Sequence, residues 1–329
     1  MTVNDPSNTP SGMSPSGAPT ALGSGAEFDI IRSIWSRLGA RGANLGDDCA
    51  IVEVGGVRLA ISSDLTLEDT HFRRGWLAPG ALGWRAATAA LSDLAAVAAT
   101  PKGILISLGL SPELPADWAG ELMSGVGEAA AEVGAMVWGG DVVRNDRIVI
   151  DAIVIGAFEA DPVLRAGARA GDLLAVTGRL GGARAALEDL LGGRSPDVTA
   201  MERFTRPRAR IAHAQWLRDR GARAMIDVSD GLVADAEHLA AASGLAAVID
   251  RELIPLHPAA ADSAMAASSG EEYELLVALP GDLAPTLVEP FAESFALPLT
   301  VVGVMEAGQG VTIRDHGHVV AESGRFSHF

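Results

Sequence analysis

The chain has very few residues of several kinds, and each shortage excludes a class of protein. Lysine occurs once, at Lys102, among 329 residues. A Walker A loop and a protein kinase each need a lysine that holds phosphates, so the sequence encodes neither. If the chain handles a nucleotide, arginines and metal ions must neutralise the phosphate charge.

Cysteine is equally scarce, because Cys49 is the only one. A single cysteine excludes an internal disulfide and fits a protein of the reducing cytoplasm. We interpret Cys49 as a small buried residue on a strand, since free cysteine packs as a small hydrophobe. Histidines with zinc-ligand spacing and a G-x-S-x-G elbow are both missing from the sequence.

Long apolar runs are also missing, because Asp, Arg or Gly interrupts each one before the ~18 residues that a membrane helix needs. Residues 1–25 lack the basic start and apolar stretch of a secretory signal. They are rich in Pro, Ser, Gly and Thr, which predicts a disordered tail.

What is abundant is acidic charge. The formal net charge is −17 and the pI is near 4.7, which argues against a nucleic-acid partner. Small phosphorylated ligands remain compatible with this charge if metal ions neutralise both sides. Hydrophobic residues make up 48% of the chain, so a sizeable core can form.

Apolar periodicity predicts a layered α/β fold in two parts. A restart of the pattern near residue 160 divides an N-terminal part (26–160) from a C-terminal part (161–329). The expected helices are 27–38, 81–99, 115–133, 181–191, 206–220 and 231–243, with Pro101 ending the second. The expected strands are 49–54, 57–63, 102–110, 135–141, 147–159, 171–178, 222–228, 245–250, 273–279 and 299–306.

Aspartates recur at the ends of these elements. Asp47 and Asp48 precede the first strand, and Ser62, Ser63 and Asp64 close the second. Because Gly55-Gly56 predicts a hairpin there, both sets of oxygens should lie near one edge of a sheet. Carboxylates with hydroxyls suit hard cations such as magnesium, although a plain loop end remains an alternative for the Asp pair.

Three further acidic positions fit the same interpretation. Asp93 interrupts a helix of small apolar residues, where a buried carboxylate needs a partner or a metal, unless it caps a break at Ser92. Asp141 follows a glycine pair that allows close approach of a ligand. The stretch 227–230 turns from strand into helix, and the amides at the start of that helix favour an anion, with a simple N-cap as the alternative. Together these positions predict a site for several magnesium ions and a phosphate.

At this point the sequence resembles thiamine-monophosphate kinases, which are related to aminoimidazole ribonucleotide synthetase. The motifs that carry the resemblance are GDDCA, ISSD followed by HF, LSDLAA, GGD, DVSDGL and GEEYEL, in the order and approximate spacing of that family. They extend over nearly everything after the tail. The resemblance implies γ-phosphoryl transfer from ATP to thiamine monophosphate with several Mg²⁺ ions. It also implies a homodimer whose N-terminal mixed sheets join, and it leaves a potassium requirement open.

The resemblance also implies roles for particular residues. The implied metal ligands are Asp48, Ser62, Ser63, Asp64, Asp93, Asp141, Asp227 and Asp230. The implied ATP contacts are Gly140, Asp141, Arg165 and Ser229. The implied substrate contacts are His71, Glu271 and Phe326. No general base is expected, because a phosphate oxygen of the acceptor is already an anion.

Some positions depart from the family pattern. Ser63 stands where threonine is often found, Leu65 replaces a common threonine, and Ser269 and Glu272 replace the usual glycine and aspartate. Ser63 keeps the hydroxyl, and Leu65 is left out of the expected site. The changes at Ser269 and Glu272 put the geometry of the substrate loop (268–274) in question. Another ATP-using synthetase of the superfamily, or a non-catalytic protein that binds metal or nucleotide, would share the aspartates. A selenophosphate synthetase is disfavoured, because no reactive cysteine loop lies near the N-terminus.

Overall fold

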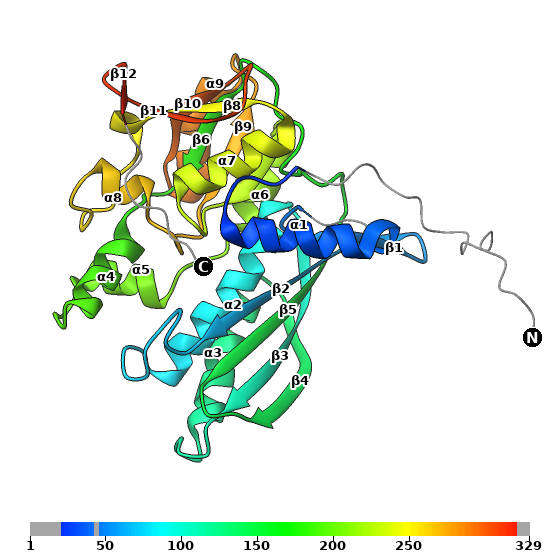
Figure 1. The fold of residues 1–329 in the computed structure, drawn as a ribbon, viewed down its shortest axis with the longest axis vertical. Helices are drawn as coiled ribbons and strands as arrows, with labels where there is room; N and C mark the ends of the chain where they lie inside the picture. Colours follow the sequence, from blue (N-terminus) through cyan, green and yellow to red (C-terminus); the bar gives the residue numbers. More distant parts are fainter. Residues whose placement is uncertain (1–20, 43–45, 321–329) are drawn as a thin grey trace, which may run out of the picture.

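The structure is a computed structural model that describes residues 21–42 and 46–320. Two α/β parts stand one above the other in Figure 1. The first part carries a five-stranded mixed sheet in the order β1-β2-β5-β3-β4. Its strands are β1 (Ala50–Val54), β2 (Val57–Leu67), β3 (Thr100–Leu110), β4 (Met136–Arg144) and β5 (Val149–Ala157).

Two helices, α2 (Pro79–Ala96) and α3 (Trp118–Glu132), pack closely together beside this sheet (Figure 1). Their backbones touch because glycines stand at the crossing. A Cβ added at Gly83 would lie 2.0 Å from the carbonyl oxygen of Leu122. Small side chains along α2 therefore serve close packing, and almost all of them are buried.

Two sequence predictions for this part were wrong in detail. Helix α2 ends at Ala96, because Ala98 turns into the left-handed region with a φ of 55°. Pro101 lies inside β3, which has a register irregularity there, so this proline does not end the helix. Strand β4 does not stop at the glycine pair but continues through it to Arg144.

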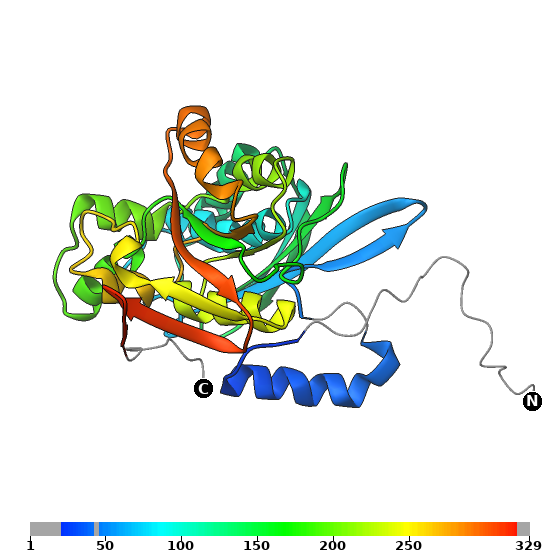
Figure 2. The same ribbon diagram turned by 90° about the horizontal axis from the view of Figure 1, so that it is seen from above.

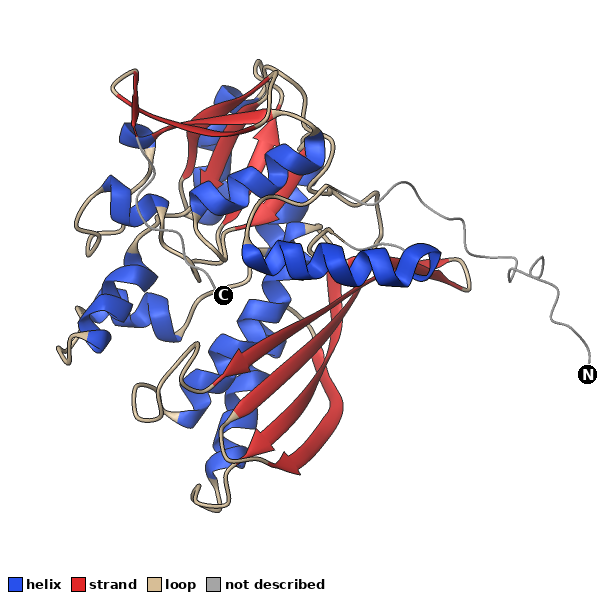
Figure 3. Ribbon diagram, in the orientation of Figure 1, coloured by secondary structure: helices blue, strands red, loops and turns tan. Residues whose placement is uncertain are grey.

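The second part is built on a seven-stranded sheet in the order β12-β11-β8-β10-β6-β9-β7, with helices around it (Figure 3). The strands are β6 (Leu173–Thr177), β7 (Ala224–Asp227), β8 (Ala246–Asp250), β9 (Leu275–Leu279), β10 (Leu299–Glu306), β11 (Gly310–Asp315) and β12 (His318–Val320). The helices are α4 (Gly182–Leu191), α5 (Val198–Thr205), α6 (Ile211–Arg218), α7 (Leu232–Ser243), α8 (Ser263–Ala267) and α9 (Ala284–Phe295), with a 3₁₀ turn, η2 (Arg251–Leu253).

Helix α1 (Ala26–Leu38) precedes the first sheet and is followed by a short 3₁₀ turn, η1 (Gly39–Arg41). Its first turn is tied to the second part, since the rings of Phe28 and His238 lie 4.1 Å apart. Figure 2 shows the β1–β2 hairpin reaching out from the rest of the molecule. The hairpin itself was predicted from its glycine pair and is confirmed in antiparallel register.

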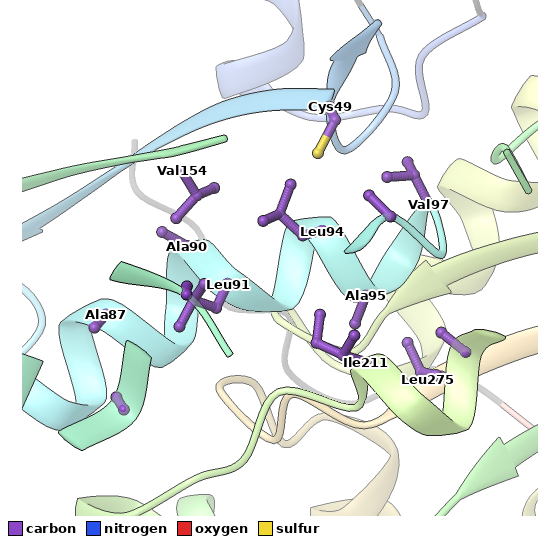
Figure 4. Close-up of a cluster of buried hydrophobic side chains, with 14 of the residues drawn as sticks. Cys49, Ala87, Ala90, Leu91, Leu94, Ala95, Val97, Val154, Ile211 and Leu275 are labelled. Carbon is purple, nitrogen blue, oxygen red and sulfur yellow. The ribbon is translucent and has the colours of Figure 1, made fainter. Parts of the chain in front are cut away.

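One hydrophobic cluster extends across both parts, and the second part has a further cluster of its own. The cluster around α2 includes Leu94 from that helix, Ile211 from α6 and Leu275 from β9 (Figure 4). Cys49 belongs to the same cluster and is 2% exposed, which confirms that it packs as a small buried residue, although it lies directly before β1 and not on the strand. Within the described residues, every helix is too short or too polar to cross a membrane.

Candidate active site

A cavity of about 270 Å³ opens where the two parts meet. The first part contributes the middle of β2, the turn that follows this strand and one face of α2. The second part contributes α4, the β7–α7 turn and the loop before β9. The lining residues are Ser63, Asp64, Thr70, His71, Ala89, Asp93, Ala183, Arg184, Leu187, Asp227, Ser229, Asp230, Ser268, Gly270, Glu271 and Tyr273. Most of the residues predicted from the sequence are thus brought together.

Three of the predicted aspartates lie close together at this site. Carboxylate oxygens of Asp48, Asp93 and Asp227 all lie within 4.8 Å of one another. Asp93 accepts a hydrogen bond from the Ser62 hydroxyl at 2.6 Å, and Asp227 accepts one from Ser92 at 2.6 Å. The turn before β1, the middle of β2, helix α2 and the end of β7 therefore converge on one point, although their residues are far apart in the sequence.

The charges in this cluster oppose one another. Burial, followed by repulsion from Asp227 and Asp48, raises the pKa of Asp93 well above its usual range. Burial and the Asp48 charge raise the pKa of Asp227 to about 7. Buried carboxylates that repel one another are stabilised by a cation, and oxygen ligands of this kind suit Mg²⁺. The donor set therefore fits a divalent metal.

Asp48 has a second partner on its other side. The Arg165 guanidinium makes a two-pronged contact with it, from Nε to Oδ2 at 3.0 Å and from Nη2 to Oδ1 at 2.7 Å. Asp47 accepts from the backbone amides of Arg165 at 3.1 Å and Asp48 at 3.0 Å. Asp47 thus holds the turn in place, whereas Asp48 presents its carboxylate to the cluster.

Ser62, Ser63 and Asp64 were predicted to close the second strand, but β2 continues past them to Leu67, because its pairing with β5 extends that far. The side chains of Ser62 and Ser63 point in different directions. Ser62 faces Asp93 on α2, whereas the hydroxyl of its neighbour Ser63 donates to Asp151 on β5 at 2.9 Å. Alternation along a strand sends successive side chains to opposite faces of the sheet. Asp151 is an acidic residue that the sequence analysis did not single out, and its one signal was a lone carboxylate inside a β-branched strand.

Asp141 lies away from the main cavity. Strand pairing sets Asp151 opposite Ser107, and Ser107 opposite Asp141, so these three form a row across the sheet. The row lines a separate cavity of about 220 Å³. Glycine is needed at position 140 because the neighbouring strand β3 approaches closely: a Cβ there would lie 1.7 Å from the carbonyl oxygen of Ile106. This packing explains the glycine without a ligand.

The amides that lead into α7 already have an acceptor. Asp235 Oδ2 accepts from the backbone N–H groups of Ser229, Asp230 and Gly231 at 3.1, 3.2 and 3.1 Å. The expectation that these amides wait for an anion was therefore wrong. Burial, together with Asp230, raises the pKa of Asp235 well above its usual range. An acid in the first turn of a helix was the signal for this contact.

The predicted substrate contacts His71 and Glu271 both line the cavity. The Leu67 amide donates to His71 Nδ1 at 2.9 Å, which leaves Nε2 as the nitrogen that carries the hydrogen in the neutral ring. Glu271 has a φ of 58° and its amide donates to the Ser229 carbonyl at 2.7 Å. Phe326 lies outside the described residues.

The two departures in the substrate loop contact each other. The Ser269 hydroxyl donates to Glu272 Oε1 at 2.6 Å. The same oxygen accepts from the amides of Gly181 at 2.7 Å and Ala183 at 3.1 Å, at the start of α4. The longer side chain of Glu272 thus joins the loop to a helix that forms one wall of the cavity. Arg184, Leu187 and Tyr273 on these walls were not identified from the sequence.

Comparison with known proteins agrees with this architecture. The models of AIR synthase related proteins match twice, with the N-terminal domain over residues 46–158 and the C-terminal domain over residues 169–316. The two sheets and the carboxylate site between them therefore define an AIR synthase related protein. Within that class, the chain belongs to the thiamine-monophosphate kinase family.

The relatives differ in how much of the chain they match. The thiamine-monophosphate kinase of Aquifex aeolicus is 34% identical over 300 residues, covering 87% of this chain and 94% of its own length. That of Mycobacterium tuberculosis is 37% identical over 201 residues, which span 60% of the relative. Among solved structures, AaThiL complexed with AMPPCP and TMP superimposes with a TM-score of 0.82 at 33% identity, covering 92% of this chain and 97% of that one.

Proposed function

We propose that this protein transfers the γ-phosphoryl group of ATP to thiamine monophosphate and so produces thiamine diphosphate. The observation that carries the proposal is the cavity itself, where buried aspartates adjoin a wall that holds His71 and Glu271. The family membership supports it, and so does the binding of AMPPCP and TMP by a related structure.

Several residues are proposed to hold magnesium. Asp48, Asp93 and Asp227 already place their oxygens close enough to share an ion. When bound, Mg²⁺ would neutralise the charge between two polyanions that otherwise repel each other. The full proposed set of ligands is Asp48, Ser62, Ser63, Asp64, Asp93, Asp141, Asp227 and Asp230. Asp141 is the outlying member, because it lines the separate cavity on the first sheet.

For the nucleotide we propose contacts from Arg165, Ser229, Gly140 and Asp141. Arg165 is supported by its position against Asp48 in the carboxylate cluster and by the affinity of guanidinium groups for phosphate. Ser229 lines the cavity beside Asp227 and Asp230. For the substrate we propose contacts from His71 and Glu271, with Phe326 as a further contact.

The chain's own contribution to the reaction is orientation and exclusion of water. The acceptor phosphate is an anion at neutral pH, so no residue has to remove a proton from it. Holding two reactants in line can lower a barrier by about 7–11 kcal/mol in the best cases. We therefore propose direct transfer without a phosphoenzyme. Labelling of the protein by [γ-³²P]ATP in the absence of acceptor would contradict this step.

The decisive test is a product assay. Purified protein incubated with ATP, Mg²⁺ and thiamine monophosphate should form thiamine diphosphate, detected by chromatography. Omitting Mg²⁺ should abolish the product. Failure to form thiamine diphosphate with all components present would refute the proposed function, and binding of ATP without turnover would then indicate a non-catalytic nucleotide-binding protein.

We also propose that the protein is a cytoplasmic homodimer joined through its first sheets. The support is strand β4, an edge strand that exposes Met136, Trp138, Val142 and Val143. An unpaired edge with apolar side chains is a ready surface for a second sheet. Paired sheets would also bring a second copy close to the cavity that contains Asp141. The single cysteine supports the reducing compartment.

A further inference from the structure

One buried arginine lies behind the wall of the cavity without lining it. Arg85 is on α2, in a run of small apolar residues, and its side chain is 3% exposed. A buried guanidinium must be paired and hydrogen-bonded to be tolerated there. Its partners are therefore informative about its role.

Arg85 contacts both of the proposed substrate residues that line the cavity, His71 and Glu271. Its Nη1 donates to the backbone carbonyl oxygen of His71 at 3.1 Å, and its Nη2 forms an ion pair with the Glu271 carboxylate. The ring of Phe204 stacks under the guanidinium, with 4.0 Å from Cζ to the ring centroid. Because an aromatic ring covers one face of this planar guanidinium, its N–H donors point outward from the edge. Those donors contact two separate loops.

The loop that carries Glu271 has an unusual backbone. Glu271 and Tyr273 have φ values of 58° and 51°, in a region that non-glycine residues rarely occupy. Such conformations are unfavourable and persist only where surrounding contacts enforce them. On one side Arg203 binds the side chain and carbonyl oxygen of Glu272, and on the other side Arg85 binds Glu271.

We propose that Arg85 is a positioning residue that sets the distance between His71 and Glu271, and with it the width of the substrate end of the cavity. This inference rests on the proposed function, because it assigns thiamine monophosphate to that end. Arg85 acts only through the two residues it holds, since it does not itself line the cavity. Loss of Arg85 should therefore affect the acceptor substrate rather than the nucleotide.

The kinetic test compares Arg85→Met and Arg85→Lys with the unmodified protein. Arg85→Met should raise KM for thiamine monophosphate about 10- to 100-fold, because small misplacement of binding groups has effects of this size. KM for ATP should change less than about threefold. Arg85→Lys keeps the charge near Glu271 but lacks the fork that also reaches His71, so its KM should lie between those of the other two proteins.

The matched control is Arg218→Met. Arg218 lies on α6, is also largely buried and donates to the carbonyl oxygen of Ala98 just after α2, but it does not approach the cavity. It should leave both KM values unchanged. If Arg85→Met and Arg218→Met have the same kinetic effect, or if Arg85→Met raises both KM values equally, Arg85 is only structural and the proposal fails.

A second measurement does not depend on turnover. In hydrogen exchange, Arg85→Met should increase the exchange of amides in both 67–72 and 268–274, whereas Arg218→Met should not. Unchanged exchange in these two loops would overturn the proposal. If the Met variant is unstable, the Lys variant is measured in the same way. If the unmodified protein makes no thiamine diphosphate, the proposed function fails, and the exchange data still decide whether Arg85 joins the loops.

Discussion

At the scale of single residues, the carboxylates of the cavity are held where their charge is unfavourable. Asp227 has its pKa raised from 3.8 to about 7 by burial and by Asp48. The folded protein therefore keeps this proton up to about pH 7, while the unfolded chain releases it above pH 4. Stability without metal should fall as the pH rises between these values, since the unfolded state then binds fewer protons.

Asp227→Asn should accordingly stabilise the metal-free protein. The amide removes the unfavourable charge and its oxygen can still accept from Ser92. We expect the free energy of unfolding in EDTA to rise on the order of 2–4 kcal/mol at pH 8, and by less at pH 5. Urea unfolding at the two pH values measures this, and the variant should lose kinase activity.

The control for this experiment is Asp219→Asn, which changes an exposed aspartate paired with Arg218. Its stability should stay close to that of the unmodified protein at both pH values, since exposed ion pairs contribute little. An Asp227→Asn protein that is less stable than the unmodified protein at pH 8 would contradict the assigned pKa direction.

At the scale of elements, the substrate loop and α4 are joined by the two residues that depart from the family pattern. Glu272→Asp would withdraw the carboxylate from the amides of Gly181 and Ala183, and Ser269→Gly would remove the hydroxyl that donates to it. Each change should cost about 1–3 kcal/mol, because buried polar groups lose their partners.

The two changes together should cost less than their sum. Once the carboxylate is withdrawn, the Ser269 hydroxyl has lost its acceptor and keeps only the Arg184 amide as a donor at 3.2 Å, so removing it costs less than in the unmodified protein. A double-mutant cycle in urea should give a coupling energy of about 1 kcal/mol. Costs that add within ~0.3 kcal/mol would show that the two departures are independent.

The sequence predicted those elements whose signal is local. Strand β5 alternates between buried and half-buried residues along its whole length, and its pattern was identified for that reason. Helices α5, α8 and α9 and strands β11 and β12 were missed. Helix α9 contains Pro290, which normally argues against a helix. The expected helix 206–220 begins only at Ile211, because Pro207 interrupts the stretch before it.

The site shows the same limit. Motif positions predicted that aspartates would gather, but not that Asp141 would line a separate cavity. That outcome depends on the register of β4 against β3 and on an irregularity at Ile104/Leu105, which are pairings between distant segments. The contacts of Arg85 were likewise invisible, because they require knowing which loops fold over α2.

At the scale of the whole molecule, a boundary near residue 160 separates the two sheets, but the hydrophobic packing crosses it. The strands of the first sheet end at Ala157 and those of the second begin at Leu173. Helix α2 nevertheless packs against α6 and β7 of the second part as well as against β2 and β5 of the first. Sequence periodicity can show that α2 is buried on all sides, but not that two sheets share it.

The proposed homodimer should be sensitive to charge on the exposed edge. The unmodified protein should have a mass twice the 33.8 kDa of one chain in light scattering after gel filtration. Val142→Lys on β4 should shift it toward monomer, since a charged edge strand disfavours sheet pairing. Val319→Lys on β12, also an exposed valine, should have no effect. A monomeric unmodified protein would refute the dimer.

Because Cys49 is buried, its reactivity can be used to measure local opening of the protein. Its thiol donates to the carbonyl oxygen of Asp93, and burial raises its pKa well above the usual range, so a thiol reagent can react only when this region opens. Labelling by a chromogenic disulfide should therefore be slow in the native protein, slower still with Mg²⁺ and AMPPCP, and immediate in denaturant. Rapid labelling of the native protein would contradict the packing described for Cys49. Because the chain has no other cysteine, the rate of that one reaction measures how often the region around Asp93 and Cys49 opens.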